Sequence, residues 1–126
     1  MTHRSRLGVI VIDCEGDDLT VAMRFWSGAL GRAFYPDPED PRYAASDTPS
    51  DEPHLILQKV GHPSRVHLDI ETDDREAERA RLEALGARLV ERHAKGFVIM
   101  EAPTGQRFCL VGPQRPDFAV AAREVG

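Results

Sequence analysis

Cysteine, aromatic residues and long apolar runs are all scarce in this sequence. Its two cysteines, Cys14 and Cys109, form no CxxC pair, which predicts two reduced thiols in a cytoplasmic protein, with one disulfide as the alternative. The apolar run behind the basic N-terminus spans only Leu7–Ile12. Such a run is shorter than a signal-peptide core and cannot cross a bilayer, so we expect no membrane association.

A concentrated basic face is also missing. The net charge is −5, and acidic and basic residues are interspersed. This pattern argues against a nucleic-acid partner, because phosphate binding needs clustered positive charge. The length of 126 residues and the apolar share of 41% suit a globular protein with one core, so we expect a single domain over residues 1–126.

The first half of the chain carries a clear strand, helix and strand. Leu7–Ile12 is continuous and β-branched, as in a buried strand, and a polar turn is expected over 13–18. A stripe of apolar residues at three- and four-residue spacing then predicts a helix over 19–30, which Gly31 ends. Residues 32–53 contain five prolines and predict loops around one or two short strands, near 33–35 and 42–44, before a strand over 55–60.

The second half begins the same order again. Val66–Glu71 alternates apolar and polar residues like a half-buried strand, and a helix is expected over 74–85, ending at Gly86. Three further strands are predicted over 88–90, 97–100 and 107–111. Residues 113–126 are expected to form a surface tail with a short helical stretch over 118–123.

The repeated order is the most informative feature. Asp18 and Asp74, at the two helix starts, are 56 residues apart, and Gly31 and Gly86, at the helix ends, are 55 apart. One half alone cannot bury both its helix stripe and its sheet face, so two halves should pair into one sheet. We place the first repeat at about 6–60 and the second at about 65–112, each a βαβββ unit.

Several motifs resemble the vicinal oxygen chelate superfamily of glyoxalase and bleomycin-resistance proteins, over roughly residues 6–112. They are Arg24-Phe25-Trp26 with Ala29-Leu30-Gly31, Arg65-Val66-His67-Leu68-Asp69 with Asp73-Asp74 and Leu85-Gly86-Ala87, and Ala102-Pro103-Thr104-Gly105-Gln106 before Phe108-Cys109-Leu110-Val111. The resemblance implies an α+β fold in which a curved, largely antiparallel sheet encloses a cavity, with the helices outside. It also implies a divalent metal held by His, Glu or Gln from four strands. A homodimer is a separate expectation.

The ligand positions that the resemblance implies are incompletely filled. His67 stands where the family supplies a histidine. Gln58, or Ile56 in the alternate register, and Cys109 stand where glutamates are common. Gly8–Val11 offers no ligand, so we expect no functional metal; if one binds, His67, Gln58 and Cys109 would hold it. The alternatives are that His67 is hydrogen-bonded to Asp69 or Arg65 and that Cys109 is an inert core residue.

The resulting hypothesis is a metal-free protein that binds a small molecule, such as an aromatic or antibiotic-like compound. Its cavity should be lined by His67, Gln58, Cys109 and Asp69, with Leu68 and Ile70 on the opposite side of their strand, beneath the second helix. The alternative is a metal-dependent lyase, isomerase or dioxygenase that uses His67, so the sequence leaves catalysis open. Cys14, expected in the turn after the first strand, is either a nucleophile or half-buried packing.

Overall fold

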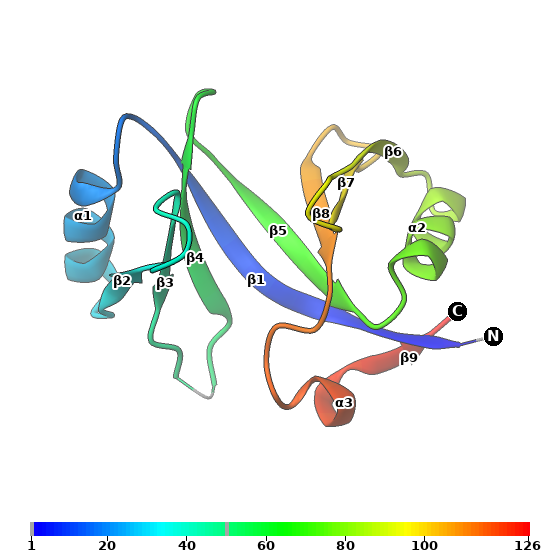
Figure 1. Ribbon diagram of the computed structural model, residues 1–126. Coiled ribbons are helices and arrows are strands. Elements are labelled where there is room, and N and C mark those ends of the chain that lie inside the picture. The colour runs from blue at the N-terminus through cyan, green and yellow to red at the C-terminus, as the bar shows by residue number, and fades with distance from the viewer. Residues whose placement is uncertain (1, 50) are drawn as a thin grey trace. The chain divides into compact units, whose positions relative to one another are not determined.

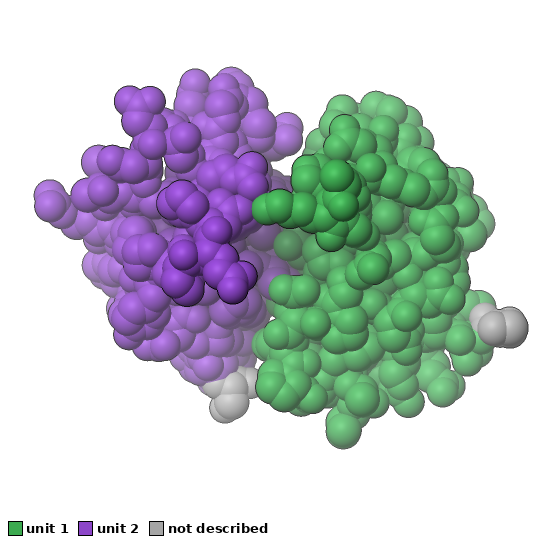
Figure 2. Space-filling model, viewed as in Figure 1, with its two compact units in different colours: residues 1–8, 68–126 green, residues 9–67 purple. Residues whose placement is uncertain are grey.

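The computed structural model describes residues 2–49 and 51–126, which divide into two compact units. Unit 1 contains the chain up to residue 8 together with residues 68–126, and unit 2 contains residues 9–67 (Figure 2). The division falls within two long strands, β1 (His3–Glu15) and β5 (Arg65–Thr72), each of which continues from one unit into the other. No helix in the described ranges is long and apolar enough to span a membrane.

Unit 2 is the first βαβββ unit. Its elements after β1 are α1 (Thr20–Leu30), β2 (Phe34–Pro36), β3 (Tyr43–Ser46) and β4 (His54–Val60). β1 pairs with β4 in parallel, β4 pairs with β3 antiparallel, and β3 pairs with β2 antiparallel (Figure 1). The expected helix, the two short strands in the proline-rich stretch and the strand that follows it are confirmed.

The core of unit 2 lies between α1 and its sheet. The stripe of α1 packs with one face of β1 around a buried cluster consisting of Leu19, Phe34, Ala44, Leu55 and Leu57. Because side chains alternate along a strand, Ile10 and Ile12 point to this core while Val9, Val11 and Asp13 point to the other face of β1. Gly31 ends the helix in the left-handed conformation, as the sequence predicted.

Unit 1 is the second βαβββ unit. After β5 it contains α2 (Arg75–Ala84), β6 (Arg88–Arg92), β7 (Val98–Glu101) and β8 (Arg107–Val111), followed by α3 (Phe118–Ala121) and β9 (Arg123–Val125). β5 pairs with β8 in parallel, and β7 pairs antiparallel with both β8 and β6 (Figure 1). The fold is therefore α+β with parallel and antiparallel pairs, and the predicted repeat of βαβββ order is confirmed.

Helix α2 begins and ends where its sequence signals lie. The Asp74 carboxylate accepts a hydrogen bond from the Ala77 amide at 2.9 Å, which caps the first turn. Leu82 of α2 packs with Ile70 of β5 against a buried cluster consisting of Val98, Met100 and Leu110. This apolar layer is the core of unit 1.

Both ends of the chain differ from the expectation. β1 begins at His3 and ends at Glu15, so Asp13 and Cys14 belong to the strand and not to a turn. The tail ends in a strand, because β9 pairs antiparallel with residues His3 to Ser5 of β1. The apolar run predicted too short a strand. The polar side chains at the start of β1 are also buried, against partners that lie far away in the sequence.

Candidate functional site

Strand β5 presents two polar side chains on one face. His67 and Asp69 alternate with Leu68 and Ile70, and Ile70 lies on the side that packs beneath α2. Leu68, however, is 44% exposed, so the expectation that it is buried beneath the second helix is wrong. The core beneath α2 includes Ile70 but does not reach Leu68, two residues earlier on β5.

His67, Asp69 and Cys109 form one cluster on β5 and its neighbour β8. Asp69 and Cys109 are register partners in the parallel pair, and His67 lies two residues before Asp69 on the same continuous strand. One ligand atom from each of the three lies within 4.8 Å of the other two, and all three residues are partly buried. An imidazole, a carboxylate and a thiol therefore meet in one place.

A second carboxylate contacts the His67 ring. Asp13 is 2% exposed, and its Oδ2 lies 2.7 Å from Nδ1 of His67 and 3.6 Å from Nε of Arg65. From the sequence we expected Asp69 or Arg65 as the hydrogen-bond partner of His67 and placed Asp13 in a turn. The contact between Asp13 and His67 was therefore missed. The signal for it was the alternation of Val9, Val11 and Asp13 along one strand face.

Gln58 lies on β4 in unit 2, as the register partner of Asp13. Its amide donates a hydrogen bond to the Tyr43 hydroxyl at 3.4 Å. The cluster of histidine, cysteine and acidic side chains draws its donors from β5 and β8 and includes Asp69. Gln58 belongs to a polar row of unit 2 in which Tyr43, Gln58 and Asp13 are successive register partners on β3, β4 and β1.

The donor types of the cluster fit a soft divalent ion. Thiolate, imidazole and carboxylate are the ligands that Zn²⁺ takes in proteins, and three protein ligands are usual in catalytic zinc sites. The set His67, Asp69 and Cys109 supplies one of each. It does not resemble the oxygen-rich environment that Mg²⁺ or Ca²⁺ prefers.

Cys14 has a different environment. Its side chain packs against the α1 core, and its Sγ lies 3.3 Å from the carbonyl oxygen of Ile12. Burial raises the pKa of the Cys14 thiol, and the neighbouring charge of Asp13 raises it further. A thiol that resists ionisation is a poor nucleophile, so Cys14 has the packing role that the sequence analysis had weighed against a nucleophilic one.

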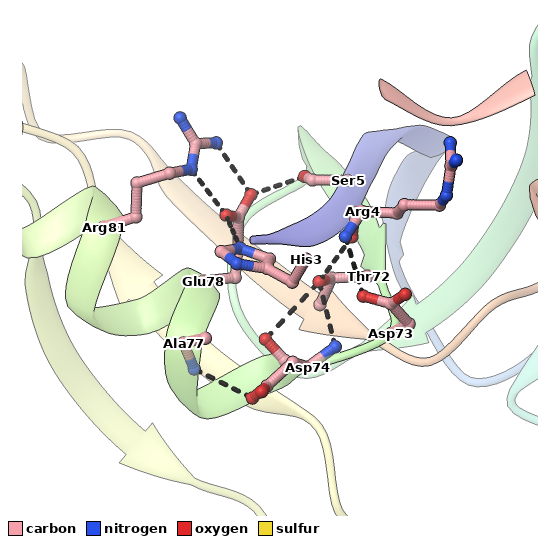
Figure 3. Close-up of polar contacts among 9 residues, drawn as sticks. All are labelled: His3, Arg4, Ser5, Thr72, Asp73, Asp74, Ala77, Glu78 and Arg81. Atoms are coloured by element: carbon pink, nitrogen blue, oxygen red, sulfur yellow. Dashed lines mark hydrogen bonds and ion pairs between the residues drawn. The ribbon is translucent and has the colours of Figure 1, made fainter. Parts of the chain in front are cut away.

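A further buried polar cluster, in unit 1, joins β1 to α2 (Figure 3). The carboxylate of Glu78 contacts Nε2 of His3 at 2.7 Å, accepts a hydrogen bond from Oγ of Ser5 at 2.5 Å, and accepts two from Arg81 at 2.7 and 2.9 Å. Burial opposes ionisation of Glu78, but these bonds outweigh it and lower its pKa to about 2. Both carboxylate oxygens are occupied by protein groups, so this cluster is a structural anchor.

Comparison with protein families gives one match over most of the chain. A model of the glyoxalase-like domain matches residues 9–111. No curated protein sequence matches significantly.

Solved structures with the same fold include two kinds of enzyme. Methylmalonyl-CoA epimerase from Mycobacterium tuberculosis is 22% identical with a TM-score of 0.59, over 91% of both chains. The Streptomyces coelicolor epimerase, in complex with 2-nitronate-propionyl-CoA, is 20% identical with a TM-score of 0.55, over 86% of this chain and 94% of that one. A homoprotocatechuate 2,3-dioxygenase variant from B. fuscum is 19% identical with a TM-score of 0.59, over 89% of this chain and 33% of that one. At these identities the likeness shows the fold alone.

Proposed function

Because the chain belongs to the glyoxalase-like domain family, we propose that it is a small-molecule-binding protein whose ligand contacts His67, Asp69 and Cys109. The observation that carries the proposal is the convergence of these three side chains within 4.8 Å on β5 and β8. Small-molecule sites combine apolar walls with a few convergent polar groups. An imidazole, a carboxylate and a thiol would orient a ligand by hydrogen bonds, and this role needs no metal.

The compounds to be tested are chosen from the ligands of similar proteins. The S. coelicolor epimerase holds a propionyl-CoA derivative, so the panel contains methylmalonyl-CoA and propionyl-CoA. The resemblance to bleomycin-resistance proteins adds bleomycin and flat aromatic antibiotics. The proposal places the protein in the cytoplasm, where two free cysteines are usual. A homodimer is part of the proposal and is measured by light scattering.

The test is a thermal-shift screen followed by calorimetric titration of each compound that raises the melting temperature. A ligand at a hundred times its Kd should raise Tm by about 10 °C. His67→Ala should weaken binding of that ligand at least tenfold, whereas the matched control His62→Ala, in the bend between β4 and β5, should not. Cys109→Ser repeats the test without removing the contact between His67 and Asp13. Equal affinities in the wild type, His67→Ala and Cys109→Ser would refute the proposed site.

A second candidate is a metal-dependent enzyme, which the donor set of His67, Asp69 and Cys109 favours. A bound divalent ion would polarise a carbonyl oxygen of the ligand. The two candidates give opposite results in elemental analysis. The metal-free binding protein should carry well under one equivalent of transition metal and keep its Tm in EDTA, whereas the metal-dependent form should carry about one equivalent and lose several degrees.

Variants separate the two candidates further. For a metal protein, Cys109→Ala should abolish binding of added Zn²⁺ in a calorimetric titration. Cys14→Ala is the matched control, because Cys14 lies in the core of unit 2 and takes no part in the cluster. Zinc binding that survives Cys109→Ala would exclude this cluster as the metal site.

A further inference from the structure

The His67 ring is held from behind by a buried carboxylate. Oδ2 of Asp13 lies 2.7 Å from Nδ1 of His67. We propose that Asp13 is a positioning residue, which keeps His67 in the tautomer that carries its proton on Nδ1 and thereby makes Nε2 the nitrogen that acts on the ligand. This inference rests on the proposed function for its consequence, but the tautomer itself can be measured without any ligand.

The hydrogen-bonding capacity of the two groups supports this tautomer. An ionised carboxylate only accepts hydrogen bonds, so a contact of 2.7 Å with Nδ1 is a hydrogen bond when Nδ1 carries the proton. A neutral imidazole has one protonated nitrogen, and Nε2 is then its acceptor. Nε of Arg65 lies 3.6 Å from the same carboxylate oxygen.

The position of Asp13 makes it a rigid support. It is 2% exposed and lies within β1, where the parallel pairing with β4 continues for two residues beyond it, to Glu15. Oδ1 accepts no hydrogen bond from the described residues 2–49 and 51–126, so the carboxylate is bound to the protein through Oδ2. Burying a carboxylate is costly unless it is hydrogen-bonded, and the His67 ring supplies that contact.

The consequence for the site concerns the orientation of the ring. A carboxylate that accepts the proton of Nδ1 fixes the ring orientation and leaves the lone pair on Nε2, as it does for histidines that bind metals. His67 lies on the same face of β5 as Asp69, with Cys109 beside it in the cluster. With Asp13 holding the ring in this way, Nε2 of His67 can accept a hydrogen bond from a ligand or coordinate a metal ion.

The internal repeat gives Asp13 a counterpart with a different role. Asp69 lies 56 residues after Asp13, the spacing that also separates Asp18 and Asp74, which precede the two helices. The position equivalent to His67 in the first half is Val11. The repeat therefore supplies two carboxylates and one imidazole: Asp13 contacts the ring, and Asp69 joins the cluster with Cys109.

The test is a long-range proton–nitrogen NMR correlation on the ¹⁵N-histidine-labelled full chain at pH 8, without ligand. The His67 signals, assigned with the His67→Ala variant, should show a protonated Nδ1 and an unprotonated Nε2. In Asp13→Asn the amide can donate to Nδ1, so the proton should move to Nε2. Asp17→Asn, an exposed neighbour beyond the end of β1, should leave the pattern unchanged.

Two results would overturn the proposal. A wild-type spectrum with the proton of His67 on Nε2 would do so without any variant, and so would an Asp13→Asn variant that folds, as judged by its other histidine signals, and keeps the wild-type pattern. A merely structural role of Asp13 would change stability but leave the tautomer unaltered. Because the spectrum is recorded without ligand, failure of the ligand panel and failure of this inference are separate results.

Discussion

Replacing Glu78 with Gln tests the anchor between β1 and α2. The side chain is 0% exposed, and the substitution keeps its size while removing the charge that Arg81, Ser5 and His3 contact. The pKa of Glu78 is lowered from 4.5 to about 2, which corresponds to about 3 kcal/mol. Loss of one partner from a buried ion pair has a similar cost, about 3–5 kcal/mol. We expect Glu78→Gln to lower the free energy of unfolding at pH 7 by about 3 kcal/mol.

The assay is urea unfolding of the wild type and the variant at a series of pH values. The folded protein holds the pKa of Glu78 below its unfolded value, so the contribution is complete above about pH 4.5 and is lost as the pH falls toward 2. The difference in the free energy of unfolding between wild type and variant should therefore disappear as the pH falls from about 4.5 to 2.

Glu76→Gln on the same helix is the matched control. The pKa of Glu76 is also lowered to about 2, by Arg92 and Arg79, but its side chain is 54% exposed, so the loss should be at most about 1 kcal/mol. Equal losses in the two variants, or a gap for Glu78→Gln that does not depend on pH, would refute the reasoning.

Four further substitutions have distinct expected effects on the free energy of unfolding, measured by urea titration. Leu68→Ala should cost less than about 1 kcal/mol because Leu68 is 44% exposed, whereas Leu110→Ala, at 0% exposure, should cost about 2–5 kcal/mol; the reverse order would mean that the faces of β5 and β8 are misassigned. Gly8→Ala should cost about 1–3 kcal/mol, because a Cβ there would lie 3.0 Å from Cγ of the buried Glu71; a neutral effect would show that Glu71 can move. Arg6→Ala should cost about 3–5 kcal/mol, because it removes the ion pair of Glu71; a loss below 1 kcal/mol would show that this ion pair contributes little to stability.

The fold could be predicted because its signals are local and occur twice. The stripe of α1, the Asp74 cap and the glycines after both helices depend on residues a few positions apart. Strand β9 has no such signal. It exists because residues 123–125 pair with residues 3–5 at the other end of the chain, and the alternation of three residues cannot show that pairing.

For the candidate site, the sequence predicted most of the residues but not the contacts between them. His67, Asp69 and Cys109 followed from strand alternation and from the resemblance, and the structure places them in one cluster. Asp13 was missed because a polar residue at the end of an apolar run was assigned to a turn. Its partner lies 54 residues away, and only the pairing of strands could connect the two.

The claim that small molecules bind at the cluster on β5 and β8 is tested most directly by mapping amide chemical shifts. The ¹H–¹⁵N spectrum of the labelled protein is titrated with the panel compound that raises Tm most. The account predicts that the largest changes occur at His67, Asp69 and Cys109, and that they disappear in His67→Ala. Changes centred instead on the buried anchor of Glu78, with the amides of β5 and β8 unaffected, would contradict it.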